Sequence, residues 1–143
     1  VHLVVMDPPF ATGTRFVARR PLGVDTTPRL EVPAFDDAWP GGLPGFLRMM
    51  DPRLQAVLAL LRGDGSLYVH VDPIASAALR LLLDELLGDT AFMREITWRI
   101  GWVSGFKSRA QNWIRNHDTI LFYVRDRERF TFHRHLVPHV TGY

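Results

Sequence analysis

The sequence predicts a single α/β domain built on a mostly parallel sheet. Two apolar segments of strand length, residues 1–6 and 66–71, each stop at an Asp-Pro pair. Two segments with helical spacing of apolar residues, 46–61 and 75–87, alternate with them, and further strand-like segments complete the chain. Strands that alternate with helices are typical of a parallel sheet covered by helices.

Size and composition fit one soluble domain. The chain has 143 residues, 47% hydrophobic and 22% charged, which is enough for one core and too little for two. No apolar run approaches the ~20 residues of a membrane span, and the start lacks the pattern of a secretion signal. Cysteine is absent, which excludes disulfides and thiolate chemistry. We expect a cytoplasmic protein with no membrane partner.

The first strand, residues 1–6, is apolar except for His2 and is followed at once by Asp7 and two prolines. A short run rich in valine is typical of a strand buried on both faces of a sheet. Because this strand begins at the first residue, we expect the chain to be part of a longer protein. Residues 11–45 are rich in Gly, Pro, Thr and Asp and predict a long loop, which in a compact domain is usually functional.

The later elements follow from apolar spacing and from the residues that interrupt it. The helix 46–61 stops at Gly63, and the leucine-rich helix 75–87 stops at Gly88. The remaining segments are predicted, in order, as a strand at 66–71, a strand at 92–100, a basic loop at 101–112, a strand at 117–124 and a short charged hairpin or edge at 125–135.

Charge is distributed unevenly along the chain. Residues 1–93 contain 8 Arg against 11 acidic residues, whereas residues 94–143 contain 9 Arg or Lys against 4 acidic residues. A basic second segment indicates a surface for a polyanion. The alternative is an ordinary solvated charged face.

The tetrapeptide Asp7-Pro8-Pro9-Phe10 combines groups that suit a planar amine. Open α/β sheets bind ligands at the carboxyl ends of their strands, and Asp7 follows the first strand directly. The prolines fix φ and supply no N–H, so the Pro8 carbonyl is a rigid acceptor. Two acceptors directed at an amino group favour a nucleophilic nitrogen, while the Phe10 ring stacks on the base. A duplex base must be flipped out of its stack to reach such a site.

This tetrapeptide resembles the Asp-Pro-Pro-Tyr/Phe motif of DNA N6-adenine and N4-cytosine methyltransferases. Segments behind it resemble the same enzymes in the expected order and cover nearly the whole chain: Ala11-Thr12-Gly13, Phe35-Asp36-Asp37-Ala38-Trp39, residues 62–72, residues 82–98 and residues 116–123. Having the catalytic motif at the start resembles the permuted β class, which includes type III modification subunits.

The resemblance implies a Rossmann-like methyltransferase fold, incomplete in this chain. The complete enzyme would transfer a methyl group from S-adenosylmethionine to the exocyclic amino group of a flipped-out base, with adenine N6 favoured. In the β class the main cofactor loop, of the type Phe-x-Gly-x-Gly, lies towards the C-terminus, and the sequence contains no such loop. We therefore expect the isolated chain to be inactive. Residues 1–143 would be one partial catalytic domain, with motif, loop and core in 1–93 and a basic DNA-facing segment in 94–143.

The resemblance also implies roles for individual residues. Asp7 and the Pro8 carbonyl would accept hydrogen bonds from the target amino group, and Phe10 would stack on the base, with Pro9 completing the rigid motif. Asp7 would also lie near the methionine part of the cofactor. Candidates for DNA contact are two residues of the catalytic loop and four cations, namely Asp37, Trp39, Arg99, Lys107, Arg109 and Arg115.

Several alternatives stay open at this point. The target could be cytosine N4, the protein could be a non-catalytic DNA-binding remnant of a modification subunit, or a related motif could serve RNA or protein methylation. The implied partners are double-stranded DNA and a restriction subunit or a second modification subunit. His70 is predicted to lie in the core. For Asp72, a turn or a helix cap before Pro73 is one prediction and a role in the site is the other. Three histidines near the C-terminus lack accompanying ligands, so we predict no metal site; they are His133, His135 and His139.

Overall fold

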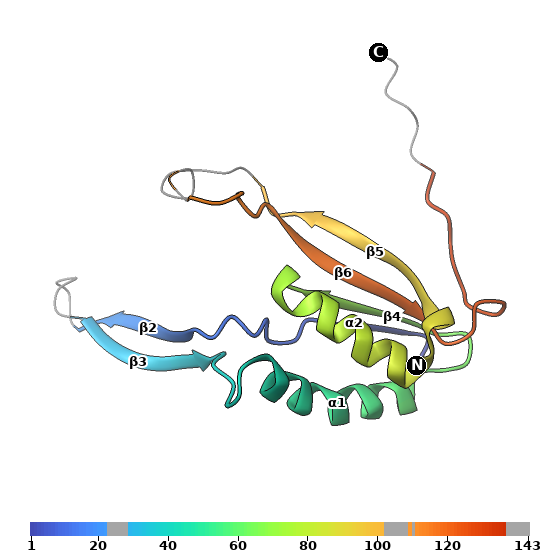
Figure 1. Ribbon diagram of the computed structural model, residues 1–143, viewed down its shortest axis with the longest axis horizontal. Coiled ribbons are helices and arrows are strands. Elements are labelled where there is room, and N and C mark those ends of the chain that lie inside the picture. The colour runs from blue at the N-terminus through green and yellow to red at the C-terminus, as the bar shows by residue number, and fades with distance from the viewer. Residues whose placement is uncertain (23–28, 102–108, 110, 137–143) are drawn as a thin grey trace, which may run out of the picture.

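The computed structural model describes residues 1–22, 29–101, 109 and 111–136. These residues form a four-stranded sheet, two helices and a separate two-stranded hairpin that extends from one end of the sheet (Figure 1). The order of strands in the main sheet is β1-β4-β6-β5. Their bounds are β1 Leu3–Met6, β4 Ser66–Val71, β5 Phe92–Arg99 and β6 His117–Val124.

The sheet is mixed rather than mostly parallel. Strands β1 and β4 pair in parallel, whereas β6 pairs antiparallel with both β4 and β5. The α/β class is confirmed, but the predicted parallel pairing holds for only one of the three neighbouring pairs. The physical reason is that β6 folds back against β5, and strands that fold back on each other pair antiparallel. Strands β1, β4 and β5 still run in one direction, so their carboxyl ends lie at the same end of the sheet.

Both helices pack on the same face of the sheet. They are α1 (Leu43–Leu60) and α2 (Pro73–Leu87), and a short 3₁₀ helix, Asp89–Ala91, links α2 to β5. The core joins apolar side chains of α1 and α2 to alternate residues of the central strands: Phe46, Met50, Leu54, Leu67, Val69, Val71, Leu79, Leu83, Leu121 and Tyr123. No helix within the described ranges is long and apolar enough to cross a membrane.

The helices begin slightly earlier than the sequence predicts because each carries a proline in its first turn. Pro44 lies in the first turn of α1, and Pro73 begins α2, positions where a missing N–H costs nothing. Asp72 caps α2, since its Oδ1 accepts a hydrogen bond of 2.7 Å from the Ile74 amide. The predicted capping role of Asp72 is therefore confirmed.

The opposite face of the sheet carries no helix in the described structure. Strand β1 was expected to be buried on both faces, and this is wrong: Leu3 is 57% exposed and Val5 is 69% exposed. On the same face Tyr68 stacks on Phe122, with ring centroids 4.5 Å apart. The predicted hairpin or edge at 125–135 is also absent, because the chain makes a turn and then continues without a strand to residue 136.

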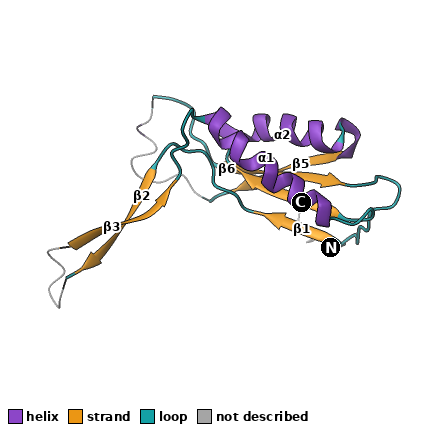
Figure 2. Cartoon of the chain, turned by 90° about the horizontal axis from the view of Figure 1, so that it is seen from below, coloured by secondary structure: helices purple, strands orange, loops and turns teal. Residues whose placement is uncertain are grey.

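Residues 11–45 were predicted as a loop but contain a β-hairpin. Strand β2 (Arg15–Pro21) pairs antiparallel with β3 (Arg29–Asp36), and the hairpin extends well beyond the sheet and helices (Figure 2). Within its two described strands, only Ala18 and Val32 are partly buried. The strands therefore lack the burial alternation that makes a strand recognisable, and Pro33 is tolerated beside a bulge in the pairing.

Candidate functional site

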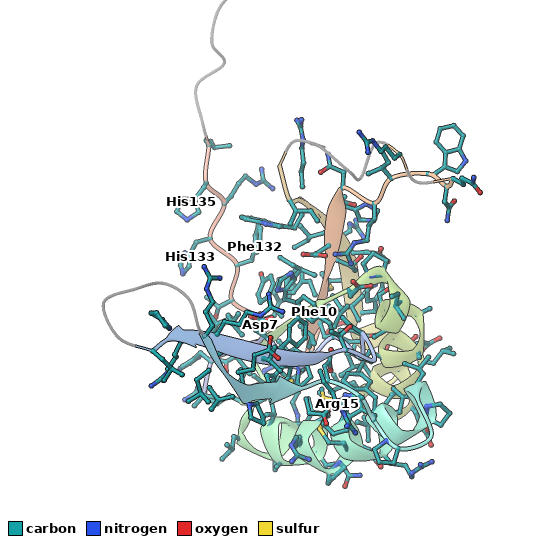
Figure 3. The ribbon with its side chains drawn as sticks, turned by 90° about the vertical axis from the view of Figure 1, so that its left-hand side faces the viewer. Asp7, Phe10, Arg15, Phe132, His133 and His135 are labelled. Carbon is teal, nitrogen blue, oxygen red and sulfur yellow. The ribbon has the colours of Figure 1, made fainter. Side chains whose placement is uncertain are left out.

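The Asp7–Phe10 motif leaves the sheet at the carboxyl end of β1, where β4 and β5 also end. The Asp7 side chain is 71% exposed, while the two prolines and Phe10 are half-buried. Figure 3 shows Asp7 and Phe10 close together beside the strands of the hairpin. The first strand thus delivers a carboxylate to solvent, and the two prolines behind it fix φ and remove competing N–H donors.

The turn after the motif is held by Asp37. Ala11 has a φ of 56°, a left-handed conformation that costs a residue with a Cβ about 1–2 kcal/mol. The Asp37 carboxylate accepts hydrogen bonds from the backbone amides of Ala11 (3.1 Å) and Thr12 (2.9 Å) and from the Thr12 hydroxyl (2.8 Å). It also accepts one from the Trp39 indole N–H at 3.0 Å. The three contacts from Ala11 and Thr12 tie the end of the hairpin to the turn that follows the motif.

Burial and hydrogen bonding shift the pKa of the Asp37 carboxyl in opposite directions. The side chain is buried, with 1% of the residue exposed, and burial raises the pKa of the carboxyl. Hydrogen bonds from Thr12, Trp39 and Ala11 outweigh burial, so the pKa of Asp37 lies below its ordinary value. The carboxylate is therefore ionised and saturated by its neighbours.

A cavity of about 430 Å³ adjoins the motif. It is lined by the motif, the turn and the base of the hairpin: Asp7, Pro8, Pro9, Phe10, Thr12, Phe16, Phe35 and Asp37. Phe16 and Phe35 stack on each other with ring centroids 6.0 Å apart. The cavity combines apolar rings with an exposed carboxylate, which is the usual composition of a site for a planar polar ligand.

A histidine and three charged groups connect Asp7 to the neighbouring strands. The His70 imidazole, at the end of β4, places Nδ1 3.0 Å from Asp7 Oδ1 and Nε2 3.4 Å from Asp118 Oδ2. The Arg115 guanidinium forms ion pairs with Asp118 and with the helix cap Asp72. Both of these aspartates are buried. The predicted placement of His70 in the core is wrong, because its ring turns to the open face and meets Asp7.

The residues predicted to contact DNA lie in different surroundings. Arg109 and Arg99 are exposed, whereas Arg115 is engaged by Asp72 and Asp118. Trp39 is half-buried against Phe46, with ring centroids 6.0 Å apart. Asp37 is buried beneath the turn, as described above. Lys107 lies outside the described residues.

Sequence reasoning missed Thr12, His70, Asp118 and the two hairpin phenylalanines as parts of this site. A partial signal existed for His70, because β1 and β4 were both predicted and each ends at an Asp-Pro pair. Aligning those pairs as parallel neighbours sets Asp72 opposite Asp7, two residues away from the observed register, so the signal indicates that β1 and β4 are neighbours but not that His70 meets Asp7. No comparable signal existed for Phe16 and Phe35, since the strands that carry them were not predicted.

No group of three or more possible metal ligands occurs among the residues that the structure describes. His133 and His135 line an open groove on the helix-free face together with His2 and His70. His139 lies outside the described residues.

Comparison with known proteins gives consistent matches. A family model described as DNA methylase matches residues 1–141. The chain is 31% identical over 126 residues to the Type II methyltransferase M.EcaI of Enterobacter cloacae, a match that covers 88% of this chain and 25% of that protein. It is 21% identical over 141 residues to the Type III restriction-modification enzyme EcoP15I Mod subunit of Escherichia coli, covering 90% and 21%. The chain thus spans a quarter or less of the length of these curated relatives.

Proposed function

The chain belongs to the N6/N4 DNA methylase family, and from this premise we propose that it carries the base-binding site of a DNA methyltransferase that modifies adenine N6. The observation that carries the proposal is the Asp7–Phe10 motif at the open end of β1, facing a cavity of about 430 Å³. We propose a Rossmann-like fold for the complete catalytic domain, to which residues 1–93 contribute the motif and most of the core, and residues 94–143 contribute the core strand β6 and a DNA-facing segment.

The chemistry follows from the groups at the motif. The exposed Asp7 carboxylate and the Pro8 carbonyl accept hydrogen bonds from the exocyclic amino group, which reduces delocalisation of its lone pair into the ring. Phe10 stacks on the base after it is flipped out. Fixed acceptors of this kind stabilise a transition state by about 10²- to 10³-fold each, because they need no reorganisation during the reaction.

S-adenosylmethionine is the proposed cofactor and supplies the methyl group. The residue of this chain that fits it is Asp7, whose exposed carboxylate complements a positively charged donor. The main cofactor loop of the Phe-x-Gly-x-Gly type is not present in these 143 residues. We propose that the isolated chain binds the cofactor weakly and does not turn over.

Double-stranded DNA is the proposed substrate. We propose that it binds at the end of the molecule where the Asp7–Phe10 motif lies. The hairpin and the described residues between β5 and β6 both lie beyond the carboxyl end of β1 (Figure 1). Arg99, the last residue of β5, and Arg109, in the connection between β5 and β6, are exposed and would contact phosphates, as would Lys107. Arg115 would contact DNA close to the Asp7–Phe10 motif, where its guanidinium pairs with Asp118. We propose that Asp37 and Trp39 act on DNA indirectly, by holding the turn behind the motif.

The choice of base and the catalytic role are tested by one experiment. The complete protein that carries this sequence is incubated with S-adenosylmethionine and unmethylated DNA, and the nucleosides are separated by mass spectrometry. We expect N6-methyladenine. N4-methylcytosine would instead establish the cytosine alternative, and DNA binding without either product would identify a non-catalytic remnant of a modification subunit.

The proposed partner is a restriction subunit or a second modification subunit. The match to a protein named as the Mod subunit of a Type III restriction-modification enzyme supports this proposal. Co-purification of the complete protein with the product of an adjacent gene tests it.

A further inference from the structure

His70 reaches the motif from a neighbouring strand. Met6 of β1 pairs in register with Val69 of β4, and Asp7 and His70 each follow by one residue. Because the two strands are parallel, both side chains leave the sheet on the same face, and His70 Nδ1 comes within 3.0 Å of Asp7 Oδ1. Among the described residues, His70 is the side chain that makes a polar contact with the Asp7 carboxylate.

The imidazole is itself held from two other directions. Its Nε2 lies 3.4 Å from Oδ2 of Asp118, a side chain that is 8% exposed. The Phe10 ring meets it edge to face, with centroids 5.0 Å apart and an interplanar angle of 84°. Asp118 is in turn paired with Arg115. His70 therefore connects an exposed carboxylate to a buried charged network.

The direction of the contact is set by its chemistry. A carboxylate offers only acceptors, so a ring that carries both protons satisfies both aspartates, with Nε2 donating to Asp118 and Nδ1 donating to Asp7. Without this donor the exposed Asp7 side chain would rotate freely, since few other groups restrain it. A surface contact of this kind contributes little to stability, so its main physical consequence is the orientation of the carboxylate.

We propose that His70 is a positioning residue for methyl transfer, an inference that rests on the function proposed above. His70 fixes the Asp7 carboxylate towards the target amino group, and Asp118 fixes the imidazole. The flipped base then meets an acceptor that already points at it, rather than one that must be ordered during the reaction.

The test uses the complete protein and separates kcat from KM. In His70→Ala we expect kcat to fall by about 10²-fold, the usual consequence of a misplaced catalytic group, while KM for DNA stays close to that of the wild type. His70→Asn keeps an N–H near the position of Nδ1 and should recover most of kcat. His70→Gln places its amide nearer the position of Nε2 and should not. His133→Ala, another histidine of the same groove, is the matched control.

Equal turnover of the wild type and His70→Ala would overturn the inference, as would equal rescue by Asn and Gln. A second measurement does not depend on activity: the crystal structure of the complete protein with His70→Ala. An Asp7 carboxylate that is reoriented or no longer held in one conformation supports the inference, whereas one that keeps its wild-type orientation overturns it. An inactive wild type in which His70→Ala still reorients Asp7 would refute the proposed function while leaving the Asp7–His70 contact in place.

Discussion

Replacement of Asp37 by Asn tests whether the turn behind the motif is held by a charge. Asn keeps one acceptor oxygen and replaces the other with an amino group. The least costly arrangement sets this amino group at the Oδ2 position, where the Thr12 hydroxyl can rotate to accept from it. The Thr12 amide, now 2.9 Å from Oδ2, then loses its acceptor, and the remaining hydrogen bonds lose their charge.

The magnitude follows from these contacts. Hydrogen bonds to a charged group contribute about 1.5–3 kcal/mol each, and an unsatisfied buried donor costs about 1–3 kcal/mol. The loss of one hydrogen bond and the weakening of the others should destabilise the turn by about 2–4 kcal/mol in Asp37→Asn. The substitution leaves the cost of the left-handed conformation of Ala11 unchanged. A free-energy difference of 1.4 kcal/mol corresponds to a factor of ten in an equilibrium constant. The equilibrium constant for opening of the turn should therefore rise by about 30-fold or more.

Hydrogen–deuterium exchange of the peptide that contains residues 11–14 measures this opening. The matched control is Asp36→Asn, the adjacent carboxylate, which is 53% exposed and pairs with Arg15 at the surface; such pairs contribute little. We expect faster exchange and reduced methyl transfer in Asp37→Asn alone. Unchanged exchange at residues 11–14 would refute the clamp. Because the pKa of Asp37 is lowered in the folded protein, its stabilisation is complete above pH 3.8 and is lost as the pH falls further.

The remaining predictions concern separate parts of the molecule. Asp7→Ala should abolish methyl transfer and leave DNA binding largely intact, as measured by radiolabelled methyl incorporation and by a mobility shift; retained turnover would exclude the assigned site. Tyr123→Phe removes a buried hydroxyl that donates to Asp84 at 2.6 Å and should cost about 1–3 kcal/mol, seen as a lower thermal midpoint. Burial, reinforced by Asp84, raises the pKa of Tyr123, so this stabilisation is lost as the pH rises above ~10. Arg109→Ala should weaken DNA binding uniformly across sequences and reduce the salt slope by about one. Residues 1–143 alone should show no micromolar S-adenosylmethionine binding by calorimetry.

The central strands could be predicted to the residue because their signal is local. The apolar runs at 66–71 and 117–124 coincide with β4 and β6, and both lie in the middle of the sheet. Their burial selects apolar side chains at most positions. Strand β1 gave the same signal yet lies at the edge of the sheet with one open face. Composition alone does not distinguish a central strand from an edge strand.

The hairpin could not be predicted because it buries almost nothing. Its strands are stabilised mainly by pairing with each other, and alternation of apolar and polar residues appears only where one face is covered. The sequence of β2 and β3 contains Arg, Glu and Pro at positions that a core would exclude. The resemblance to methyltransferases indicated that this region belongs to the catalytic loop. It did not indicate that the region forms a hairpin.

Within the site, the part that is local in sequence was predicted and the part that depends on register was not. Asp7 and Phe10 are only three positions apart in the chain, so their combination can be recognised directly from the sequence. Asp37 was associated with the site through the segment around Trp39, but its hydrogen bonds to Thr12 connect residues 25 positions apart. The contact of Asp7 with His70 spans 63 positions and requires the parallel register of β1 and β4.

The two long-range contacts solve different parts of one physical problem. An acceptor for an amino group must be accessible to the base, which leaves it exposed, and it must also be oriented before the base arrives, which exposure opposes. Asp37 fixes the backbone that follows the motif, and with it the ring of Phe10. His70 fixes the side chain of Asp7 from the neighbouring strand. If this division is right, Asp37→Asn should impair stacking and hydrogen bonding to the base together, whereas His70→Ala should impair hydrogen bonding alone. Fluorescence of 2-aminopurine at the target position, which reports stacking of the flipped base, would then change in the first variant and not in the second.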